Sequence, residues 1–579
     1  MAAHFNKALK AAVTLLASQG QLRDSSVSDL PLSVAREPAQ LTTTTSTVIS
    51  TDPFKSTLEF GYSYGTPWMT NFSAPMCGDE YSVLYLKWSA ACPLGIQFDR
   101  IAAVWINGVE LLRTSTEEPD RKSGVTWEVA KDVSTYYDVV KQGGDVVVSL
   151  DNVIEGRYNS SFTITLAAEF YKPLTSSQSH SVIKKPSSKP DLVLPISKSA
   201  TTYGWFTVEP NSVGKNFKLV TLPLNTEELY LEVFLSHHQC DEFYYANPPD
   251  SYAQPLGWCG GGPFREVQVL VDDELVGVVW PFPLLFTGGL NPYLWRPIVA
   301  IGAFNAPTYV LNLTPFLGKF LDNQQHNVTF FVDYGVDFWP IDGNLLAYTD
   351  KYGKATKAKV LEKRIDRHVV PTVTSQVNGL DANFTLQASR SFYVKSSVTT
   401  SKGTKIYMIN QQLDYSNRQE YLENGDIGVF EGHTKVKTTH SVSSLFGIVQ
   451  STITQHEDYP IYGRSYYKPR ADGSYILDAD LQNAFTRSLS IKASPLELLF
   501  PTSFHFNYEP KRVDIALNGT ASVDSLVGGS GTTQASYQSK SPTSGCFLRK
   551  VAATAGVLTK DETDTKCASL SLRSEDDEA

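Results

Sequence analysis

Charged side chains that could perform acid–base chemistry gather at the two ends of one segment, Gln97 to Pro119. Asp99 and Arg100 stand near its start, and Glu117 and Glu118 stand at its end. A carboxylate can take a proton from water, a carboxylic acid can protonate a leaving group, and an arginine fork can bind an oxyanion. These residue types could perform general acid–base catalysis, provided that the chain brings the two ends together.

The residues between these ends predict how they meet. Asn107-Gly108 separates two apolar runs, which is typical of a two-residue hairpin turn. The expected cross-strand pairs are Ile106 with Val109, Trp105 with Glu110, Ala102 with Arg113, and Asp99 with Thr116. The hairpin would thus collect an arginine and three carboxylates at its open rim. A solvated salt-bridge cluster is the alternative interpretation of this rim.

Composition indicates an all-β protein. Aromatic residues make up 12% of the 579 residues, and Gly and Pro are frequent, which favours strands over helices. A net charge of −10 argues against a nucleic-acid partner, which needs a basic face. No run of about 18 apolar residues is present, so no membrane-spanning helix is expected.

Cysteines and glycosylation sequons indicate the secretory pathway. Six cysteines fall into three local pairs, although roughly 15 connectivities are open to six cysteines. The pairs expected from proximity are Cys77–Cys92, Cys240–Cys259 and Cys546–Cys567. The sequons are at Asn71, Asn159, Asn312, Asn327, Asn383 and Asn518. Residues 1–20 are a candidate signal peptide, and the expected destination is the exterior or an acidic vacuole or lysosome.

Strand patterns divide the chain into several parts. After a Ser/Thr-rich leader at 21–56, short alternating strands predict a β-sandwich at 57–173. The polar segment 174–199 has the composition of a linker. The remaining parts are expected to be a second sandwich at 200–350, a bracing β-rich region at 351–540, and a tail at 541–579 that holds Cys546 and Cys567.

The second sandwich repeats a feature of the first. Arg265 lies seven residues before Asp272-Asp273, as Arg100 lies seven before Asn107-Gly108. Each arginine also follows a phenylalanine closely and trails a cysteine. We therefore expect an equivalent hairpin in the second sandwich, and a site at the junction that is lined by the open ends of both hairpins.

Five long motifs resemble the plant-type peptide-N-glycanase A family of acidic glycoamidases. They are FDRIAAVWINGVELLRTSTEEP (98–119), DEFYYANPP (241–249), GPFREVQV (262–269), VVWPFPLLFTGG (278–289) and NPYLWRPI (291–298). The resemblance covers about residues 57 to 350 and keeps the family order. Glu117 departs from the pattern, because the family has a small residue there; Glu118 is the more family-like acid.

The resemblance implies two adjacent jelly-roll-like sandwiches and a glycoamidase that needs no metal or cofactor. Such an enzyme cleaves the bond between GlcNAc and asparagine in an N-glycopeptide, releases the whole glycan as a glycosylamine, and leaves aspartate. A second hypothesis, from another class, is a non-catalytic carbohydrate-binding jelly-roll protein, because a fold does not secure a function.

Site residues are assigned on this basis. Asp99 is the first candidate for the acid–base role and Glu118 the second, with a further carboxylate expected from the second sandwich, where Glu242 and Glu266 compete. The candidate substrate-binding residues are Arg100, Arg265 and Arg296, for hydroxyls or the oxyanion, and Trp258 and Trp295, for stacking on GlcNAc.

Three other chemistries are disfavoured by their surroundings. The residues from Gly61 to Gly65 fit the sequence pattern of a serine nucleophile elbow, but the segment lacks the strand–turn–helix context that the elbow needs. His237, His238, Cys240 and Cys259 fit no standard zinc spacing. A disulfide between the two cysteines would also remove the nucleophile that cysteine catalysis requires.

Overall fold

The computed structural model describes β1 (Ser26–Ser28) and residues 67–72, 83–119, 124–171, 189–198 and 204–565, apart from gaps at 211, 213, 495–503, 507, 509 and 543–544, together with Cys567. The candidate signal peptide, most of the leader and Cys77 lie outside the described residues. Within the expected leader, β1 pairs in parallel with β6 (Val125–Asp132).

The first sandwich consists of two four-stranded sheets. One sheet has the order β1-β6-β3-β8, and the other has the order β2-β7-β4-β5. The remaining elements are β2 (Trp68–Phe72), β3 (Val83–Cys92), β4 (Ile101–Ile106), β5 (Val109–Ser115), η2 (Ser134–Tyr136), α3 (Tyr137–Lys141), β7 (Gly144–Leu150) and β8 (Thr163–Tyr171).

The second sandwich repeats the pairing of one of these sheets, since β11-β16-β13-β14 corresponds to β2-β7-β4-β5, and its other sheet has five strands. Its sheets have the orders β10-β17-β12-β15, with β9 added to β17, and β11-β16-β13-β14. Its strands are β9 (Leu192–Ile196), β10 (Phe206–Val208), β11 (Phe217–Val220), β12 (Thr226–Leu235), β13 (Glu266–Val271), β14 (Glu274–Val279), β15 (Tyr309–Asn312), β16 (His326–Asp333) and β17 (Trp339–Thr349). Its helical turns are η3 (Gln239–Asp241), η4 (Tyr244–Ala246), α4 (Asp250–Ala253), η5 (Gln254–Leu256), η6 (Pro292–Leu294) and η7 (Thr314–Lys319).

Hairpin β13–β14 occupies the place that hairpin β4–β5 has in the first sandwich. The first strand of each hairpin also pairs with a strand that comes later in the chain: β4 pairs with β7, and β13 pairs with β16. Both turns use two residues with positive φ, Asn107-Gly108 and Asp272-Asp273. The predicted equivalence of the two hairpins is therefore confirmed, whereas the jelly-roll description stays a prediction.

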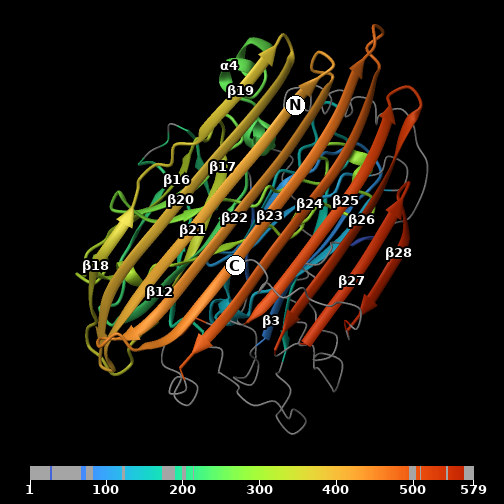
Figure 1. Ribbon diagram of the computed structural model, residues 1–579. Coiled ribbons are helices and arrows are strands. Elements are labelled where there is room, and N and C mark those ends of the chain that lie inside the picture. Colours follow the sequence, from blue (N-terminus) through green and yellow to red (C-terminus); the bar gives the residue numbers. More distant parts are fainter. Residues whose placement is uncertain are drawn as a thin grey trace.

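The C-terminal part is one eleven-stranded sheet rather than a bracing region followed by a tail (Figure 1). In this sheet β18 lies next to β20, and the strands from β20 to β28 follow in sequence order. Strand β19 also pairs with β20. Its strands are β18 (Lys357–Ile365), β19 (Thr372–Asn378), β20 (Asp381–Thr400), β21 (Gly403–Leu422), β22 (Ile427–Ser444), β23 (Val449–Pro469), β24 (Tyr475–Ala493), β25 (Lys511–Asp524), β26 (Gly528–Ser541), β27 (Gly545–Thr554) and β28 (Val557–Asp564).

Two expected boundaries are corrected by these strands. Residues 541–579 are not simply a tail, because β27 and β28 extend the sheet through Asp564. The linker 174–199 contains β9, which pairs with β17 over Gly343–Ala347. Strand β9 is apolar but only five residues long, and the polar residues that precede it gave the whole segment the composition of a linker.

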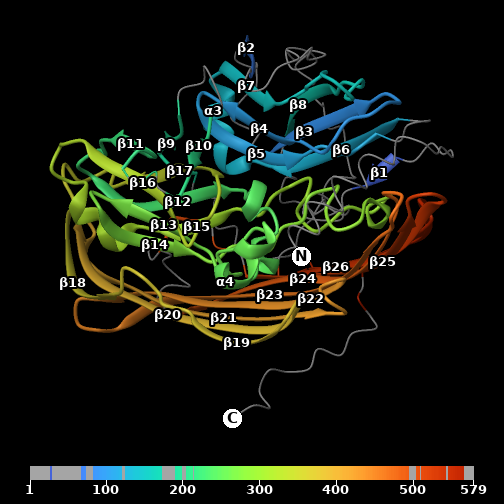
Figure 2. The same cartoon turned by 90° about the horizontal axis from the view of Figure 1, so that it is seen from above.

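Alternating side chains explain how the long sheet packs. In β20, Ala382, Phe384 and Leu386 are buried while Asn383 and Thr385 are exposed, so one face points inward. The second sandwich lies on that inner face, with the first sandwich on the side away from the sheet (Figure 2). Strands β5 and β13 are buried along their whole length because both of their faces are covered.

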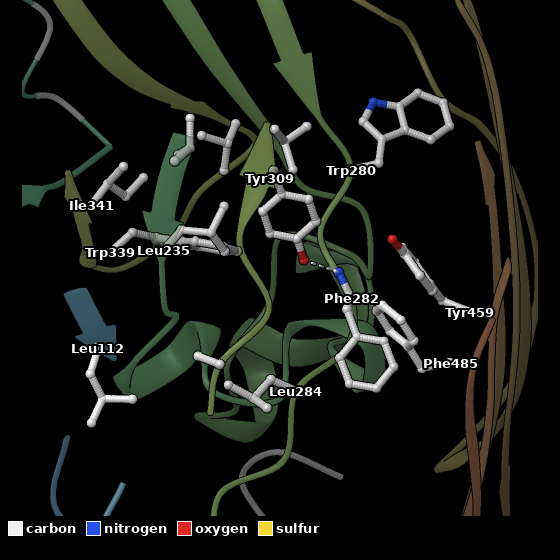
Figure 3. Close-up of a cluster of buried hydrophobic side chains, with 14 of the residues drawn as sticks. Leu112, Leu235, Trp280, Phe282, Leu284, Tyr309, Trp339, Ile341, Tyr459 and Phe485 are labelled. Carbon is white, nitrogen blue, oxygen red and sulfur yellow. Dashed lines mark hydrogen bonds between the residues drawn. The ribbon is translucent and has the colours of Figure 1, made fainter. Parts of the chain in front are cut away.

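A continuous aromatic core joins the three parts. Leu112 of the first sandwich, Trp339 of the second, and Tyr459 and Phe485 of the long sheet belong to one cluster (Figure 3). The segment between β14 and β15 fills its centre, where the Tyr309 hydroxyl accepts the Phe282 N–H at 2.8 Å. This segment carries the family-like residues 280–298, so the core fixes their backbone.

Two of the three expected disulfides are confirmed. Cys240–Cys259 and Cys546–Cys567 are bonded. Cys92 is buried, with its Sγ 3.3 Å from Ser160 Oγ, and has no disulfide partner among the described residues. Because Cys77 is not described, its pairing with Cys92 stays a prediction.

The sequons differ in accessibility. Asn71, Asn159, Asn383 and Asn518 are exposed and Asn327 is partly exposed. The prediction for Asn312 is wrong for the folded chain, because its side chain is buried and its Oδ1 accepts the Thr314 N–H at 3.0 Å. In the part of the chain that the structure describes, no helix has the length and apolar character needed to cross a membrane.

Candidate active site

The hairpin β4–β5 brings the acidic residues together with a register that differs from the predicted one. Ile106 faces Val109 and Trp105 faces Glu110 as expected, but a bulge at Leu111 shifts the remaining pairs by one residue. Arg100, not Asp99, therefore lies opposite Thr116; the Arg100 N–H donates to Thr116 Oγ1 at 2.8 Å. Continued by one residue, this register places Asp99 opposite Glu117.

The turn Thr287–Gly288–Gly289 of the second sandwich holds the Asp99 carboxylate. The Gly288 N–H donates to Asp99 Oδ2 at 3.1 Å, and Thr287 Oγ1 donates to the Thr116 carbonyl at 2.6 Å. A Cβ on Gly288 would lie 2.8 Å from Glu118 Oε1 and 3.2 Å from Asp99 Oδ1. Asp99 and Glu118 thus converge on one backbone position, where a Cβ would displace at least one of the two carboxyl groups.

Electrostatics distinguish Asp99 from an ordinary surface carboxylate. Burial raises the pKa of Asp99 above its usual range, while the Gly288 N–H and the Arg100 charge lower it in part. Asp99 therefore binds a proton more readily than an exposed aspartate does. This behaviour suits a general base better than a hairpin cap.

Glu242 is the carboxylate that the second sandwich contributes. Burial, and then the neighbouring Asp99 charge, raise the pKa of Glu242 to about 8. Phe243, the next residue, packs on the turn, since a Cβ on Gly289 would lie 3.3 Å from its ring. The Asp99 charge acts on Glu242, so Glu242 stays the candidate carboxylate of the second sandwich.

The loop of Glu242 is anchored by its neighbours in the chain. Asp241 is buried, and its Oδ2 accepts the N–H groups of Val336, Asp337 and the Trp339 indole at 2.7–3.1 Å. The Cys240–Cys259 disulfide closes the same loop. Both contacts restrict the backbone on the N-terminal side of Glu242, which fixes the carboxyl group relative to Asp99.

Glu117 was expected at the hairpin rim but was given no role, and the structure places it in the site. It is buried, and its Oε2 has no hydrogen-bond partner in the described structure. Burial raises its pKa well above the usual range; the Arg296 charge opposes this shift, and Glu118 and Asp99 add to it. The signal that could have identified it was its position next to Glu118, combined with its departure from the family pattern.

Two of the three expected arginines lie at the site. The Arg100 guanidinium donates to Gln97 Oε1 at 3.1 Å and lies 5.1 Å from the centre of the Tyr158 ring. Arg296 Nη2 donates to the Glu118 carbonyl at 3.2 Å. Both side chains are partly exposed, so each can reach a substrate oxygen from the rim.

The structure does not support a substrate-binding role for Arg265. Its side chain is buried and forms a 2.7 Å ion pair with Asp241, with further hydrogen bonds to the carbonyls of Gly262 and Phe264. Glu266, the competitor of Glu242, is also buried, paired to Arg390 at 2.7 Å and to the Trp280 indole at 2.8 Å. Both residues belong to the interior of the second sandwich, so only the first hairpin contributes its open end to the site.

Arg265→Ala should therefore unfold the protein more easily without changing the affinity for substrate. Removing one partner of a buried ion pair costs about 3–5 kcal/mol, because Asp241 would stay buried without its counter-charge. Urea unfolding measures the loss, and KM of the folded variant should stay within about twofold of wild type.

The matched control is Arg418→Ala, which breaks an exposed pair with Glu420 and should cost under about 1 kcal/mol. A normal unfolding curve together with a raised KM in Arg265→Ala would restore the binding role.

The two tryptophans have different surroundings. Trp295 is fully buried and its indole donates to the Gly289 carbonyl at 2.6 Å, so the expected stacking on GlcNAc is wrong for this residue. It supports the turn that holds Asp99 instead. Trp258 is partly exposed and packs on Tyr252 and Tyr421, beside the long sheet, and its role as a sugar platform stays a prediction.

His237 and His238 are packed among aromatic rings rather than arranged as ligands. His238 is stacked between Phe286 and Phe338, and burial lowers its pKa to about 3. Burial also lowers the pKa of His237 to about 4. No group of three or more His, Cys, Asp or Glu side chains in the described residues is arranged to hold a metal ion.

Fold and site together define an all-β protein with a cluster of carboxyl side chains at the junction of two adjoining sandwiches. The family model described as peptide N-acetyl-beta-D-glucosaminyl asparaginase amidase A matches residues 38–365, and the model of the PNGase_A C-terminal domain matches residues 383–461. Peptide-N4-(N-acetyl-beta-glucosaminyl)asparagine amidase A of Prunus dulcis is 33% identical over 527 residues, covering 89% of this chain and 90% of that protein. This chain belongs to the peptide-N-glycanase A family.

Solved structures resemble part of the chain. Peptide-N-glycanase F, a glycosylasparaginase from Flavobacterium meningosepticum, is 15% identical and covers 51% of this chain and 93% of its own, with a TM-score of 0.34. PNGF-II is 12% identical and covers 53% of this chain and 65% of its own, with a TM-score of 0.33.

Proposed function

We propose that this chain is a glycoamidase that hydrolyses the amide between N-linked GlcNAc and asparagine in glycopeptides. The observation that carries the proposal is the convergence of Asp99 and Glu118 on Gly288, with Glu242 close enough to interact with Asp99. Family membership supports the substrate class. The hypothesis of a non-catalytic carbohydrate-binding protein is disfavoured, because binding alone does not require carboxyl groups with shifted pKa values.

Each carboxyl group has a role that follows from its surroundings. Asp99, ionised, takes a proton from the water that attacks the amide carbonyl. Glu242, whose raised pKa keeps it neutral, protonates the departing nitrogen of the glycosylamine. Arg100 or Arg296 stabilises the oxyanion of the tetrahedral intermediate, and Glu118 orients substrate beside Gly288. Asparagine becomes aspartate, and the glycan leaves intact as the glycosylamine.

The pH dependence of kcat/KM should be bell-shaped. Activity should rise with pH as Asp99 ionises, on an acid limb above the usual range of aspartate, since the pKa of Asp99 is raised. It should fall as pH passes about 8, where Glu242 loses the proton that it donates. Glu242→Gln should lower kcat and abolish the alkaline limb. A wild-type optimum above pH 8 would contradict these assignments.

The reaction is tested by incubating the protein with one defined N-glycopeptide in water enriched in heavy oxygen. Amide hydrolysis converts the glycosylated asparagine to an aspartate that carries one heavy oxygen atom, and mass spectrometry of the peptide detects it. Cleavage within the glycan would leave a GlcNAc on the peptide, and a binding protein would leave the whole glycan. Asp99→Asn, purified in parallel, excludes a contaminating activity.

We further propose that the enzyme works in the secretory pathway or in an acidic vacuole or lysosome. Two disulfides and several exposed sequons support this assignment, because both are typical of that route. The net charge of −10 supports the absence of a nucleic-acid partner. Peptide mapping with and without glycosidase treatment would show whether Asn71, Asn159, Asn383 and Asn518 carry glycans in the protein from its native tissue.

A further inference from the structure

A buried ionic cluster connects the two sandwiches directly behind the active site. Arg113, on β5, is buried, and its Nε and Nη2 donate to the two Glu110 oxygens at 2.7 Å each. Its Nη1 reaches across the junction to Ser236 Oγ at 3.0 Å and to the Pro340 carbonyl at 2.9 Å. One guanidinium therefore joins the first sandwich to the ends of two strands of the second.

Both connected segments lead into the site. A few residues after Arg113, the same segment provides Glu117 and Glu118. A few residues after Ser236, the chain provides Glu242. The distance between the carboxyl groups of the two sandwiches therefore depends on how this guanidinium is held.

A second carboxyl group, Asp342, faces the same arginine. Its Oδ1 lies 3.4 Å from Arg113 Nη2, and its Oδ2 accepts the Trp105 indole N–H at 2.8 Å. Asp342 and Glu110 are both fully buried, and burial and the Glu110 charge raise the pKa of Asp342 well above its usual range. Arg113 already makes a bidentate pair with Glu110, so a second carboxylate would lack a full counter-charge.

The remaining charged groups around the cluster do not supply the missing charge. Glu232 of β12 accepts from Thr308 Oγ1 at 2.6 Å and is hydrogen-bonded to Tyr136. Lys131 of β6 lies 4.8 Å from the Phe234 ring, and burial lowers its pKa. His238 stays neutral because burial lowers its pKa. With all acids ionised, the three carboxylates Glu110, Asp342 and Glu232 exceed the two cations Arg113 and Lys131 by one charge.

We propose that Asp342 holds a proton beside the Glu110–Arg113 pair, and that this proton keeps Arg113 in the position that aligns the catalytic carboxyl groups of the two sandwiches. Arg113, Glu110 and Asp342 are then positioning residues, and the junction is intact in acid and loosens as the proton leaves. The activity readouts below rest on the proposed function, whereas the unfolding readout does not.

The direction of the pH effect follows from the raised pKa of Asp342. In the unfolded chain Asp342 ionises near its ordinary value of about 4, whereas in the folded chain it keeps the proton to a higher pH. Its contribution to stability is complete below the unfolded pKa and is lost as pH rises toward the folded pKa. An asparagine at this position mimics the protonated acid and cannot titrate.

The test compares Asp342→Asn with wild type in urea unfolding from pH 4 to pH 8. On unfolding in this pH range, wild type should release about one more proton than the variant does. The variant should therefore gain stability relative to wild type as pH rises. Parallel curves for the two proteins, or a variant that is less stable at every pH, would overturn the proposal, because Asp342 would then act as an ionised partner of Arg113.

A second readout separates the junction from the reversible titration of Glu242. Both proteins are held at pH 8, returned to pH 5 and assayed. Asp342→Asn should retain several-fold more of its starting activity than wild type, and equal losses would contradict the proposal. The matched control is Asp138→Asn, an exposed carboxylate of the first sandwich, which should lose activity as wild type does.

Arg113→Lys tests the positioning role itself. The ammonium keeps the charge but cannot make the fork to Glu110 together with the bonds to Ser236 and Pro340. kcat should fall by at least about tenfold while KM changes by less than about twofold, because misplaced carboxyl groups slow the chemical step. A raised KM with unchanged kcat would place Arg113 on the substrate side and overturn the role. If this variant does not fold, the Asp342→Asn comparison still decides the proposal.

Discussion

Asp99→Asn should lower kcat by at least ~10²-fold, because the amide keeps the size of the side chain but cannot accept the proton of the attacking water. KM should change little, since Asp99 acts on the reacting water rather than on the sugar. The Gly288 N–H can still donate to the asparagine Oδ1, so the turn should stay in place.

The same substitution should not destabilise the protein at neutral pH. The pKa of Asp99 is raised in the folded chain, so the ionised carboxylate costs stability as pH rises, and asparagine removes that cost. Urea unfolding at pH 5 and pH 7 checks this, and the gain should be larger at pH 7. A folded Asp99→Asn enzyme with full activity would show that the hairpin rim is structural and that the chemistry takes place elsewhere.

Gly288→Ala should be nearly as damaging, although it removes no functional group. The new Cβ would lie 2.8 Å from Glu118 Oε1, closer than non-bonded carbon and oxygen atoms approach, and 3.2 Å from Asp99 Oδ1, which is a tight contact. Either carboxylate must move, and a displacement of about 1 Å can cost about 10²-fold in rate. We expect kcat to fall by at least ~10-fold with the fold retained.

The neighbouring residue provides the control for this variant. Thr287→Ser keeps the hydroxyl that donates to the Thr116 carbonyl and adds no atom near the carboxylates, so its kcat should resemble that of wild type. Near-normal kinetics of Gly288→Ala would mean that Glu118 and Asp99 do not need this spacing. Crystal structures of both variants would show which carboxylate moves.

Local signals in the sequence were sufficient for the hairpins. Asn107-Gly108 and Asp272-Asp273 adopt the positive φ angles that two-residue turns require, and this preference belongs to the residues themselves. The proximity of Cys240 to Cys259 and of Cys546 to Cys567 was likewise enough to predict two disulfides, because short loops close at low entropic cost. The all-β class followed from alternation and composition for the same reason.

Family-like motifs located the site but did not sort its residues. Glu242 and Glu266 could not be distinguished in the sequence, since each lies in a family-like motif of the second sandwich. Only the packing shows that Glu266 is paired to Arg390 of the distant strand β20, which leaves Glu242 beside Asp99. Arg265 was misassigned for the same reason, because its partner Asp241 comes from a different loop.

The sequence by itself thus determined the strand class, the turns, two disulfides and the segment that carries Asp99 and Glu118. The tertiary structure decided the bulge at Leu111, which places Glu117 rather than Thr116 opposite Asp99, and the role of Gly288 as the point where two carboxylates meet. It also decided which charges are buried in pairs and which face the site. Turns and alternation depend on interactions between residues close in the chain, whereas pairing and burial depend on contacts between segments far apart in sequence.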